Sequence, residues 1–568
     1  MFKTSLIALA TLLSPILFAA AAAPDVKRPK SGETVEVLVQ YGLQPTSEDH
    51  QRVTDRRGRL KAAFENVPVA HYEVTPEALA DLEANPNVVS INPNRAVYAS
   101  DVYATMSANY NAVANYYNGA GLTMGTGIGV AIIDSGVDAA HPDFNRLWSS
   151  TNRVVYSQSF VGGDTNDEYG HGTHVAGIVA GADNVTAGAP NVIQSFYGVA
   201  IDANIINLKV LNGTGGGTDA NVIAGIDRAI ALKSTYNIRV INLSLGRPVA
   251  VSYKSDPLCQ AVEAAWKAGI VVVVAAGNNG RDNSQNTQGY GTITAPGNDP
   301  YVITVGATND KESFNRVNSV IATYSSKGPT SIDHIVKPDV VAPGNRVVSY
   351  QSSGALLPTQ YPANQIPTST FISGGSAAYS PYYLTLSGTS MAAPLVAGIA
   401  VMLVAQNPAV TPDQIKTRLM KTAWRGFPAT MSTTVTNPNG STTTYTANHD
   451  IFTIGAGLVD GWAAYNYTSV PNLSAASPAA MIFFNTVSLQ YNNNIFGSTV
   501  IWGSSSPYAT TAIWGSNVNG NTVIWGSTVI WGSTTILGST AIWGSTAIWG
   551  STASDAAETL AIAINGEN

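Results

Sequence analysis

The chain is poor in cysteine and in charge. Only 11% of its 568 residues are charged, no long run of lysine or arginine occurs, and the formal net charge is −7. Nucleic-acid binding depends on clustered positive charge, so this composition excludes nucleic acid as a partner. The single cysteine, Cys259, excludes a disulfide within the chain, and the fold must be held by packing or by metal ions. Cys259 lies in a predicted helix, PLCQAVEAAWKAG, where a core role is expected rather than a nucleophilic one.

Residues 1–23 have the composition of a secretory signal peptide. Lys3 supplies the positive end, Leu6–Phe18 is apolar, and Ala19–Ala23 provides small residues for cleavage. The alternative is an uncleaved membrane anchor, but the small-residue end favours cleavage. We therefore predict a secreted protein, released to the extracellular space or held at the cell surface.

Residues 24–104 are predicted to form a small α+β domain. Strands are expected at VEVLVQY, AHYEV and VVSINPN, because apolar residues alternate there. Helices are expected over Ser47–Asn66 and in TPEALADLEAN, where Thr75 is a cap and Pro76 the first helical residue. Charged residues are dense here and sparse afterwards, which places the boundary between Tyr98 and Tyr110.

Residues 105–466 show a different pattern, in which apolar strands alternate with helices. Continuous Val/Ile runs occur in GVAIIDSG, NIINLKVLN, RVINLSLG, GIVVVVAAGN and YVITVGA. Runs without alternation are typical of strands covered on both faces, so the predicted fold is α/β with a largely parallel sheet and helices on both faces. Ligands of such folds bind beyond the carboxyl ends of the strands.

One serine is placed at the start of a strongly apolar helix. The stretch Leu386–Gln406, LSGTSMAAPLVAGIAVMLVAQ, runs from a Gly-Thr-Ser turn into uncharged residues, and Pro394 is expected in or near the first helical turn. Ser390 would then lie at the positive end of the helix dipole, where its own N–H can hold an oxyanion. The alternative is an ordinary turn serine before a core helix.

A nucleophilic serine needs a histidine to take its proton and a carboxylate to orient that histidine. Asp134 directly follows the apolar run that ends at Ile133, and His171 opens the small-residue helix GHGTHVAGIVAG. Taken singly, Asp134 could cap a turn and His171 could be a satisfied core histidine. Together with Ser390, they can meet at one edge of a parallel sheet.

The segments IDSGVD, HGTHVAG and GTSMAAP, in this order, resemble the three active-site motifs of the subtilisin-like serine proteases, the subtilases. The resemblance implies a subtilisin-like fold and a serine endopeptidase that works through an acyl-enzyme and requires no cofactor for its chemistry. It implies Ser390 as nucleophile, His171 as general base and then acid, and Asp134 as the carboxylate that fixes the imidazole tautomer. His174, three residues further along the helix, is the rival base, and the resemblance makes it structural.

Further segments resemble the substrate-binding parts of the same family. AAGNNG implies that Asn278 donates to the oxyanion together with the Ser390 N–H, with Asn279 as the alternative if the register shifts by one. Ser244–Gly246 resembles the segment that pairs with an extended peptide substrate, and GTGGG, residues 213–217, resembles the opposite edge. GTGGG would otherwise be a flexible loop, and no lysine follows it in the spacing of a nucleotide-binding loop. The expected pocket walls are small and uncharged, which favours a broad apolar or aromatic preference. The predicted substrate-binding residues are Gly213, Gly215, Ser244, Leu245, Gly246, Ala275, Ala276 and Gly277.

A calcium site is also implied by resemblance to proteinase K-like subtilases. Its ligands would be the carbonyl oxygens of Pro300 and Val302 and the Asp339 carboxylate, and oxygen ligands are those that calcium prefers. The alternative is a simple turn with an aspartate facing solvent. Residues 351–383, rich in Ser, Pro and Tyr, appear as an insertion before the nucleophile, either a lid or a loop that restricts the substrate.

The small α+β domain resembles the propeptide that precedes many subtilases. This implies that polypeptide substrates share the cleft with the chain's own propeptide, an intramolecular inhibitor that the enzyme removes itself between Ala99 and Met106.

Residues 467–568 form a tail that contains repeats close to STAIWG, from Phe496 to Ser551. Because the period of six is even, an extended strand would place every tryptophan on one face. The tail is therefore either a stacked β-solenoid or adhesive strand array, or a low-complexity segment. Exposed tryptophan favours attachment to a cell surface or polymer. The alternative function is a catalytically inert surface or adhesion protein that acts through these repeats, and the complete triad with Asn278 argues against it.

Overall fold

The structure is a computed structural model. It describes residues 21–490, apart from 24–25, 95, 100–123, 187–188, 190, 312, 314, 437–440, 471–473 and 484–485, and also residues 564, 566 and 567. Residues 1–20 of the predicted signal peptide and the whole STAIWG repeat lie outside the described residues. The chain divides into two compact units: residues 1–63 with 68–94, and residues 64–67 with 95–568.

The first unit is an α+β domain with one five-stranded sheet, as the apolar alternation predicts. The strand order is β1-β5-β2-β4-β3, and the helices bury Val53, Leu79 and Leu82 against the sheet. Thr75 caps α2, as expected. The elements are β1 (Ala21–Ala22), β2 (Val35–Tyr41), α1 (Ser47–Asp55), β3 (Arg59–Ala63), β4 (Val69–Val74), α2 (Pro76–Glu83) and β5 (Val88–Pro93).

The helix predicted over Ser47–Asn66 is wrong in its second half. The helix ends at Asp55, Arg57 adopts a left-handed backbone with φ of 62°, and the chain turns back as strand β3. β3 is almost wholly exposed, so its sequence, RLKAA, carries no apolar alternation by which a strand could be recognised.

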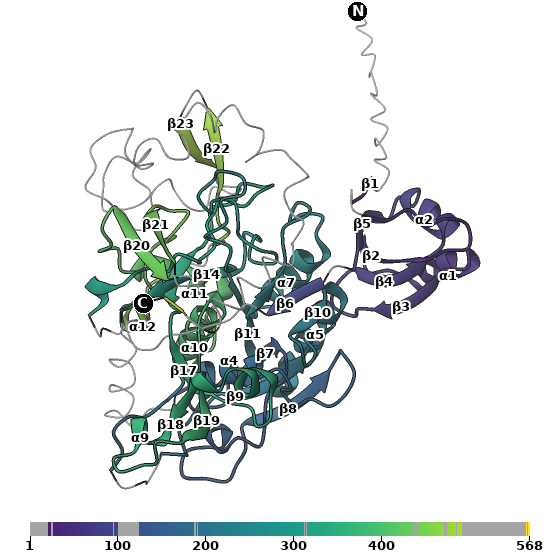
Figure 1. The fold of residues 1–568 in the computed structure, drawn as a ribbon. Helices are drawn as coiled ribbons and strands as arrows, with labels where there is room; N and C mark the ends of the chain where they lie inside the picture. Colours follow the sequence, from purple (N-terminus) through teal and green to yellow (C-terminus); the bar gives the residue numbers. More distant parts are fainter. Residues whose placement is uncertain are drawn as a thin grey trace, which may run out of the picture. The chain divides into compact units, whose positions relative to one another are not determined.

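The second unit is built on an eight-stranded sheet, and the predicted α/β class with a largely parallel sheet is confirmed (Figure 1). The order is β15-β14-β13-β11-β7-β9-β8, with β16 also pairing with β14, and β15 is the antiparallel member. All five apolar runs chosen from the sequence are strands of this sheet. The strands are β7 (Gly129–Asp134), β8 (Val154–Ser159), β9 (Asn204–Lys209), β11 (Ile238–Leu243), β13 (Val271–Ala275), β14 (Ile303–Asn309), β15 (Val320–Ile321) and β16 (Val340–Pro343).

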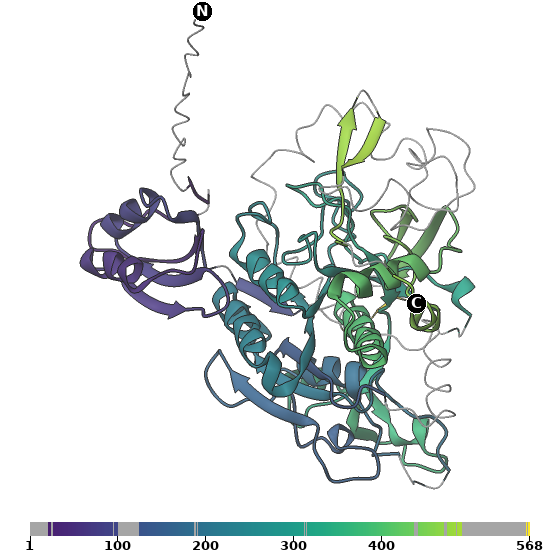
Figure 2. The same cartoon turned by 180° about the vertical axis from the view of Figure 1, so that it is seen from behind.

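Helices cover both faces of this sheet (Figures 1 and 2). α5 and α7 pack together on one face, and α4 and α10 pack together on the other. Cys259 is buried in α7, where its thiol donates to Asn298 Oδ1 at 3.3 Å, in agreement with a core role. The helices are α4 (His171–Ala180), α5 (Asp219–Ala231), α6 (Lys233–Tyr236), α7 (Pro257–Lys267), α10 (Thr389–Gln406), α11 (Pro412–Thr422) and α12 (Gly461–Asn466).

The central helix α10 contains a proline just after its first turn, consistent with the predicted position in or near that turn. Pro394 cannot donate the usual hydrogen bond to the carbonyl of Ser390, four residues earlier. The Ser244 hydroxyl donates to that carbonyl instead, at 2.6 Å. Within the described residues α10 is apolar and long enough to pass for a membrane span, but 89% of it is buried, so it is a core helix.

The insertion before the nucleophile is a folded part of the second unit. Residues 351–383 contain β18 (Gln365–Pro367), the start of β19 (Tyr379–Leu386) and the short helices α8 (Leu356–Gln360) and α9 (Thr368–Phe371). With the preceding strand β17 (Val347–Tyr350), β18 and β19 form an antiparallel sheet. Leu386, the last residue of β19, pairs with Val347. Because α10 begins three residues later, this sheet fixes the direction from which the chain enters the nucleophile turn.

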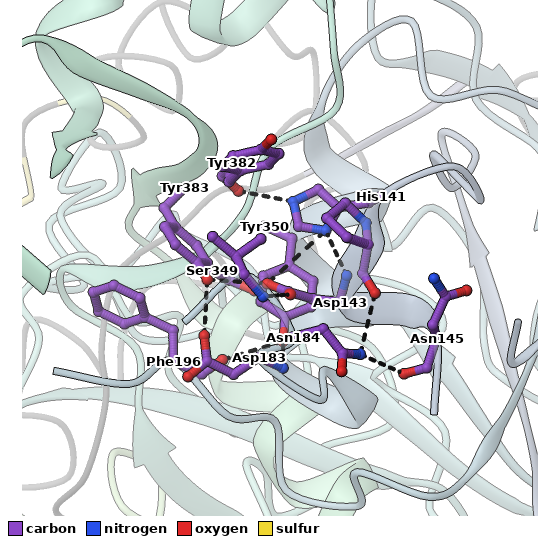
Figure 3. A network of polar contacts seen from close by, with 12 residues as sticks. His141, Asp143, Asn145, Asp183, Asn184, Phe196, Ser349, Tyr350, Tyr382 and Tyr383 are labelled. Carbon is purple, nitrogen blue, oxygen red and sulfur yellow. Dashed lines mark hydrogen bonds and ion pairs between the residues drawn. The ribbon is translucent and has the colours of Figure 1, made fainter. Parts of the chain in front are cut away.

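A buried polar network holds β19 in place (Figure 3). The Tyr383 hydroxyl lies 3.0 Å from Asp143 Oδ2 and 2.8 Å from Asp183 Oδ1, while His141 donates to the Tyr382 carbonyl at 3.0 Å. One phenol has a single hydrogen, so it cannot donate to both carboxylates at once. Burial, with the neighbouring Asp183, raises the pKa of Asp143 to about 7. The network therefore favours one protonated carboxyl group.

This network predicts a pH-dependent stability. The raised pKa of Asp143 stabilises the fold fully below about pH 4, and this contribution is lost as pH rises through about 7. The unfolding free energy of the Ser390→Ala protein, an inactive background that prevents self-digestion, should decrease between pH 4 and pH 7. Adding Asp143→Asn should make this decrease smaller by roughly 1 kcal/mol or more. Denaturant unfolding at several pH values measures it. Asp164→Asn, at a carboxylate with 72% side-chain exposure, is the control, and identical pH profiles for all three proteins would contradict the network.

Candidate active site

Asp134 and His171 form a buried pair at the carboxyl edge of the sheet. Asp134 is the last residue of β7 and His171 the first of α4, and both are fully buried. His171 Nδ1 lies 2.6 Å from Asp134 Oδ1, and the same oxygen accepts from the Ser135 N–H at 2.7 Å. A carboxylate bonded to Nδ1 holds the proton there, which leaves Nε2 as the nitrogen that can accept a proton.

Glycine next to the histidine allows this close approach. A Cβ atom on Gly172 would lie 2.1 Å from the backbone oxygen of Gly136, so any other residue would push α4 away from β7. Glycine is therefore needed at this position of the HGTH motif, because a side chain would prevent the close packing of α4 against the end of β7.

Asp167 supports the pair, and the sequence analysis missed it. Its carboxylate accepts from the Gly170 and Thr173 N–H groups and from the Ser135 hydroxyl, each at 2.8 Å. It therefore caps the first turn of α4, where Gly170 offers no side chain. The sequence did contain a signal for this role, because an aspartate shortly precedes a helix whose N-cap residue is glycine.

Ser390 is brought to the same edge by α10. It is the second residue of that helix, and its hydroxyl donates to the Ser244 carbonyl at 3.1 Å. Ile132 of β7 pairs with Asn242 of β11, so Asp134 and Ser244 stand two residues further along adjacent parallel strands. Because α4 and α10 also pack together, Ser390, His171 and Asp134 gather at one edge of the sheet.

Asn278 is fixed by the residue before the nucleophile. Its Oδ1 accepts from the Thr389 N–H at 2.9 Å and from the Thr389 hydroxyl at 3.1 Å. With the oxygen engaged in this way, the Nδ2 hydrogens are the ones suited to donate to a substrate oxyanion. The neighbouring Asn279 is placed through its backbone, whose N–H donates to the Ser326 hydroxyl at 3.0 Å.

The rival histidine, His174, is structural. Its Nε2 lies 3.2 Å from the Val347 carbonyl and 3.1 Å from the Leu384 carbonyl, which requires a proton on Nε2. Complete burial, and the nearby His171, lower the pKa of His174 to about 3. It therefore stays neutral and is committed to holding the β17–β19 sheet.

A three-stranded antiparallel sheet contains the segments predicted to be substrate-binding edges. Its order is β10-β6-β12, with β6 (Ala96–Ala99) between β10 (Gly216–Thr218) and β12 (Leu245–Gly246). Leu245 pairs with Ala99 and Gly216 with Tyr98. An extended peptide segment of the chain itself thus lies between the two predicted edges. Gly213 and Gly215 lie in the turn that precedes β10, whereas Ser244 holds the nucleophile.

The predicted pocket walls also come together. A Cβ atom on Gly246 would lie 2.6 Å from Thr294 Oγ1, and one on Gly277 would lie 2.8 Å from Thr294 Cγ2. Ala275 ends β13, and the Ala276 carbonyl accepts from the Thr294 N–H at 3.0 Å. The walls are small and uncharged at these positions.

Arg247 joins the two predicted substrate edges, and its role was not predicted from the sequence. It directly follows β12, and its guanidinium pairs with Asp219 at 2.8 Å, just after β10, and with Asp256 at 2.7 Å. Burial alone would lower the pKa of Arg247, but the two carboxylates raise it above its ordinary value. A buried, doubly paired arginine positions the edges without touching the nucleophile.

The oxygens proposed as calcium ligands converge, but they surround a lysine. Lys416 Nζ donates to the carbonyls of Pro300 at 2.8 Å and Val302 at 2.9 Å, and lies 3.1 Å from Asp339 Oδ1. Lys337 Nζ approaches the other Asp339 oxygen at 2.7 Å. A divalent cation would be repelled by two buried ammonium groups at this position. The three residues as arranged do not fit a calcium ion, because the Lys416 ammonium takes its place.

Replacing this internal cation should destabilise the fold regardless of calcium. Lys416→Met, in the Ser390→Ala background, removes one of two donors from the Pro300 and Val302 carbonyls, the donor to the Ser477 hydroxyl and one of the two cations paired with Asp339. The loss should cost about 2–3 kcal/mol of unfolding free energy. Lys421→Met on the same helix is the control. Denaturant unfolding with calcium and with a chelator should give the same difference. A loss that appears only when calcium is removed from the unsubstituted protein would contradict the assignment.

Comparisons with known proteins agree with this geometry. A model of the subtilase family matches residues 125–457. Serine protease AprX of Bacillus subtilis (strain 168) is 36% identical over 386 residues, covering 66% of this chain and 78% of the relative. Subtilisin DY of Bacillus licheniformis is 36% identical over 301 residues, covering 53% of this chain and 84% of the relative.

A solved structure resembles the fold. The crystal structure of fervidolysin from Fervidobacterium pennivorans, described as a keratinolytic enzyme related to subtilisin, matches with a TM-score of 0.55 and 22% identity. The match covers 80% of this chain and 64% of fervidolysin, slightly less than two thirds of its length. At this identity the likeness supports the fold alone.

Proposed function

Because the chain belongs to the subtilase family and is a serine endopeptidase of that family's Asp-His-Ser type, we propose that Asp134, His171 and Ser390 are its catalytic residues. The observation that carries this proposal is the 2.6 Å contact between His171 Nδ1 and Asp134 Oδ1, at the sheet edge that also holds Ser390. Subtilases need no cofactor for catalysis, and every step can be carried by these side chains.

The proposed reaction begins when the Ser390 hydroxyl turns from the Ser244 carbonyl toward His171. The oxygen attacks the substrate carbonyl carbon while its proton passes to His171 Nε2, and Asp134 stabilises the imidazolium through Nδ1. The oxyanion accepts hydrogen bonds from Asn278 Nδ2 and the Ser390 N–H. His171 then gives its proton to the leaving amine, and a water molecule hydrolyses the acyl-enzyme by the same steps in reverse.

The substrate is proposed to bind as an extended polypeptide between β10 and β12. Backbone pairing on both sides gives affinity for any sequence, and the small uncharged walls at Gly246, Gly277 and Thr294 admit apolar or aromatic side chains. We therefore assign a broad preference, with Leu245 and Gly246 as one pairing edge and residues 216–218 as the other.

Maturation by self-cleavage is proposed for the segment that lies between these edges. β6 pairs with both β10 and β12, as the product side of a cleaved chain would, and it ends at Ala99. Cleavage between Ala99 and Met106 would leave residues 24–104 as a bound inhibitor of the peptidase. The amino-terminal pattern of a signal peptide further supports export before this step.

The repeat tail is proposed to attach the secreted enzyme to a cell surface or polymer. The support is its row of tryptophans at an even period, which can present one aromatic face. Deleting residues 496–551 should leave peptidase activity intact and move the protein from the bound to the soluble fraction. Unchanged partitioning would remove the proposal.

Covalent labelling separates a working peptidase from an inert relative of the same fold. A phosphonofluoridate serine reagent should modify the processed protein at Ser390, as mapped by peptide mass spectrometry, and heating the protein first should abolish the label. His171→Ala should reduce labelling strongly, because the hydroxyl then lacks its base. Absence of label on folded, processed protein would favour the inert surface protein.

A further inference from the structure

The residues that follow the repeats return to the second unit. We call Ile564, Gly566 and Glu567 the closing segment. Glu567 is buried, with 2% exposure. Its carboxylate pairs with Arg281 at 2.8 Å and accepts from the Thr323 N–H at 2.9 Å and from the Thr323 hydroxyl. A buried carboxylate that is held by a guanidinium and two further donors is bound specifically, unlike a chance contact at the surface.

The backbone of the closing segment is recognised as well. The Asn345 side chain donates to the Glu567 carbonyl and accepts from the Glu567 N–H, both at 2.9 Å. Asn364 donates to the Ile564 carbonyl at 2.9 Å. An amide that bonds both backbone groups of one residue fixes that residue through its backbone, so the site recognises the Glu567 backbone together with its acidic side chain.

Gly566 lies in a tightly packed position. It has φ of +60°, and a Cβ atom would lie 2.6 Å from Ser387 Oγ and 3.1 Å from Asn345 Oδ1. The left-handed backbone and the close Ser387 and Asn345 side chains both favour glycine at this position. The contacts therefore select a Gly-Glu pair.

The loops that hold this segment are those that shape the oxyanion site. Arg281 lies three residues after Asn278, and Ser387 three residues before Ser390. Asn345 follows Gly344, whose carbonyl accepts from the Gly388 N–H at 2.8 Å and from the Tyr324 hydroxyl at 2.6 Å. The site is thus separate from the strand edges that bind substrate, although it shares loops with the nucleophile turn.

We propose that the peptidase unit carries a second peptide-binding site, specific for a Gly-Glu segment, which the chain fills with its own closing segment. Before the repeats the chain is also held, since the Ala480 N–H donates to the His334 carbonyl at 2.8 Å. The chain is therefore held to the second unit on both sides of residues 491–563, which contain the STAIWG repeats. Release of the repeats from the enzyme needs two cuts or the loss of this site.

A double-substitution cycle on the full chain tests the pairing. In the Ser390→Ala background, Arg281→Ala and Glu567→Ala should each lower the thermal midpoint by about 2 °C or more, and the double variant should fall no further than the larger single effect. Glu558→Ala, at a carboxylate between the repeats and the closing segment, should leave the midpoint unchanged. Additive effects of Arg281→Ala and Glu567→Ala would overturn the proposal.

Peptide binding tests the specificity. A chain that ends at residue 560, shown to be folded by its circular dichroism, should bind a fluorescent AINGEN peptide, which reproduces residues 563–568. A peptide with glutamine in place of glutamate should bind at least tenfold more weakly, and Arg281→Ala should abolish binding. Equal affinity for both peptides, or no binding at millimolar peptide, would overturn the proposal. If the shortened chain does not fold, the substitution cycle decides alone.

Discussion

Ser390→Ala is expected to lower kcat on a peptide substrate by on the order of 10⁶-fold, the size of effect known for the nucleophile of subtilisin itself. The substitution removes the hydroxyl proposed as the nucleophile and leaves the backbone of α10 in place. Steady-state kinetics on processed protein measures the loss. Ser373→Ala, at an exposed serine of the β17–β19 insertion, should keep full activity.

The same variant tests self-processing. If the enzyme cuts its own chain after β6, pure Ser390→Ala protein should remain uncleaved in the segment from Ala99 to Met106. Its intact mass should then include residues 24–104. Addition of a small amount of active enzyme should then restore cleavage in trans. Cleavage of the pure variant at that position would show that another protease performs the step. A kcat of the Ser390→Ala enzyme within 100-fold of the unsubstituted enzyme would contradict the assignment of Ser390 as the nucleophile.

Asn278→Ala is expected to lower kcat by roughly 10²–10³-fold with little change in KM, the range established for the equivalent donor in subtilisin. The amide donates to an oxygen that bears full charge only in the tetrahedral state, so its loss affects the transition state more than substrate binding. The Asn278 oxygen also accepts from Thr389, however, and alanine removes that support together with the donor.

Asn278→Asp separates the two roles. Aspartate keeps an acceptor for the Thr389 N–H but carries no hydrogens for the oxyanion, so kcat should fall at least as far as in the alanine variant. Asn279→Ala should cost no more than a few-fold. If Asn278→Asp retained activity near that of the unsubstituted enzyme, Asn278 would be a support for Thr389 and not an oxyanion donor.

The sequence was sufficient to predict those parts of the fold and site that a local sequence pattern specifies. The five Val/Ile runs indicated strands covered on both faces, and all five are strands of the central sheet. The carboxyl edge of that sheet was therefore the expected position of Asp134 and Ser390. The structural role of His174 followed from the family motif. Its two carbonyl partners, on β17 and β19, now give the physical reason.

What the sequence could not predict depends on contacts between distant segments. The calcium motif was present in Pro300, Val302 and Asp339, but Lys416 enters from a helix more than seventy residues later and fills its centre. The Ser390 carbonyl, deprived of its helical donor by Pro394, is satisfied by Ser244 from a neighbouring strand end. Neither partner is marked by local pattern, because each contact is made by a single long-range side chain.

The most direct test of the catalytic assignment is the separation of His171 Nε2 from Ser390 Oγ in a crystal structure of the mature enzyme. With the hydroxyl turned away from Ser244, we predict a distance within hydrogen-bond reach, about 2.6–3.2 Å, while Nδ1 stays bonded to Asp134. An imidazole that no rotamer of Ser390 can reach, or that has left the Asp134 carboxylate, would contradict the assignment of these three residues as the catalytic group.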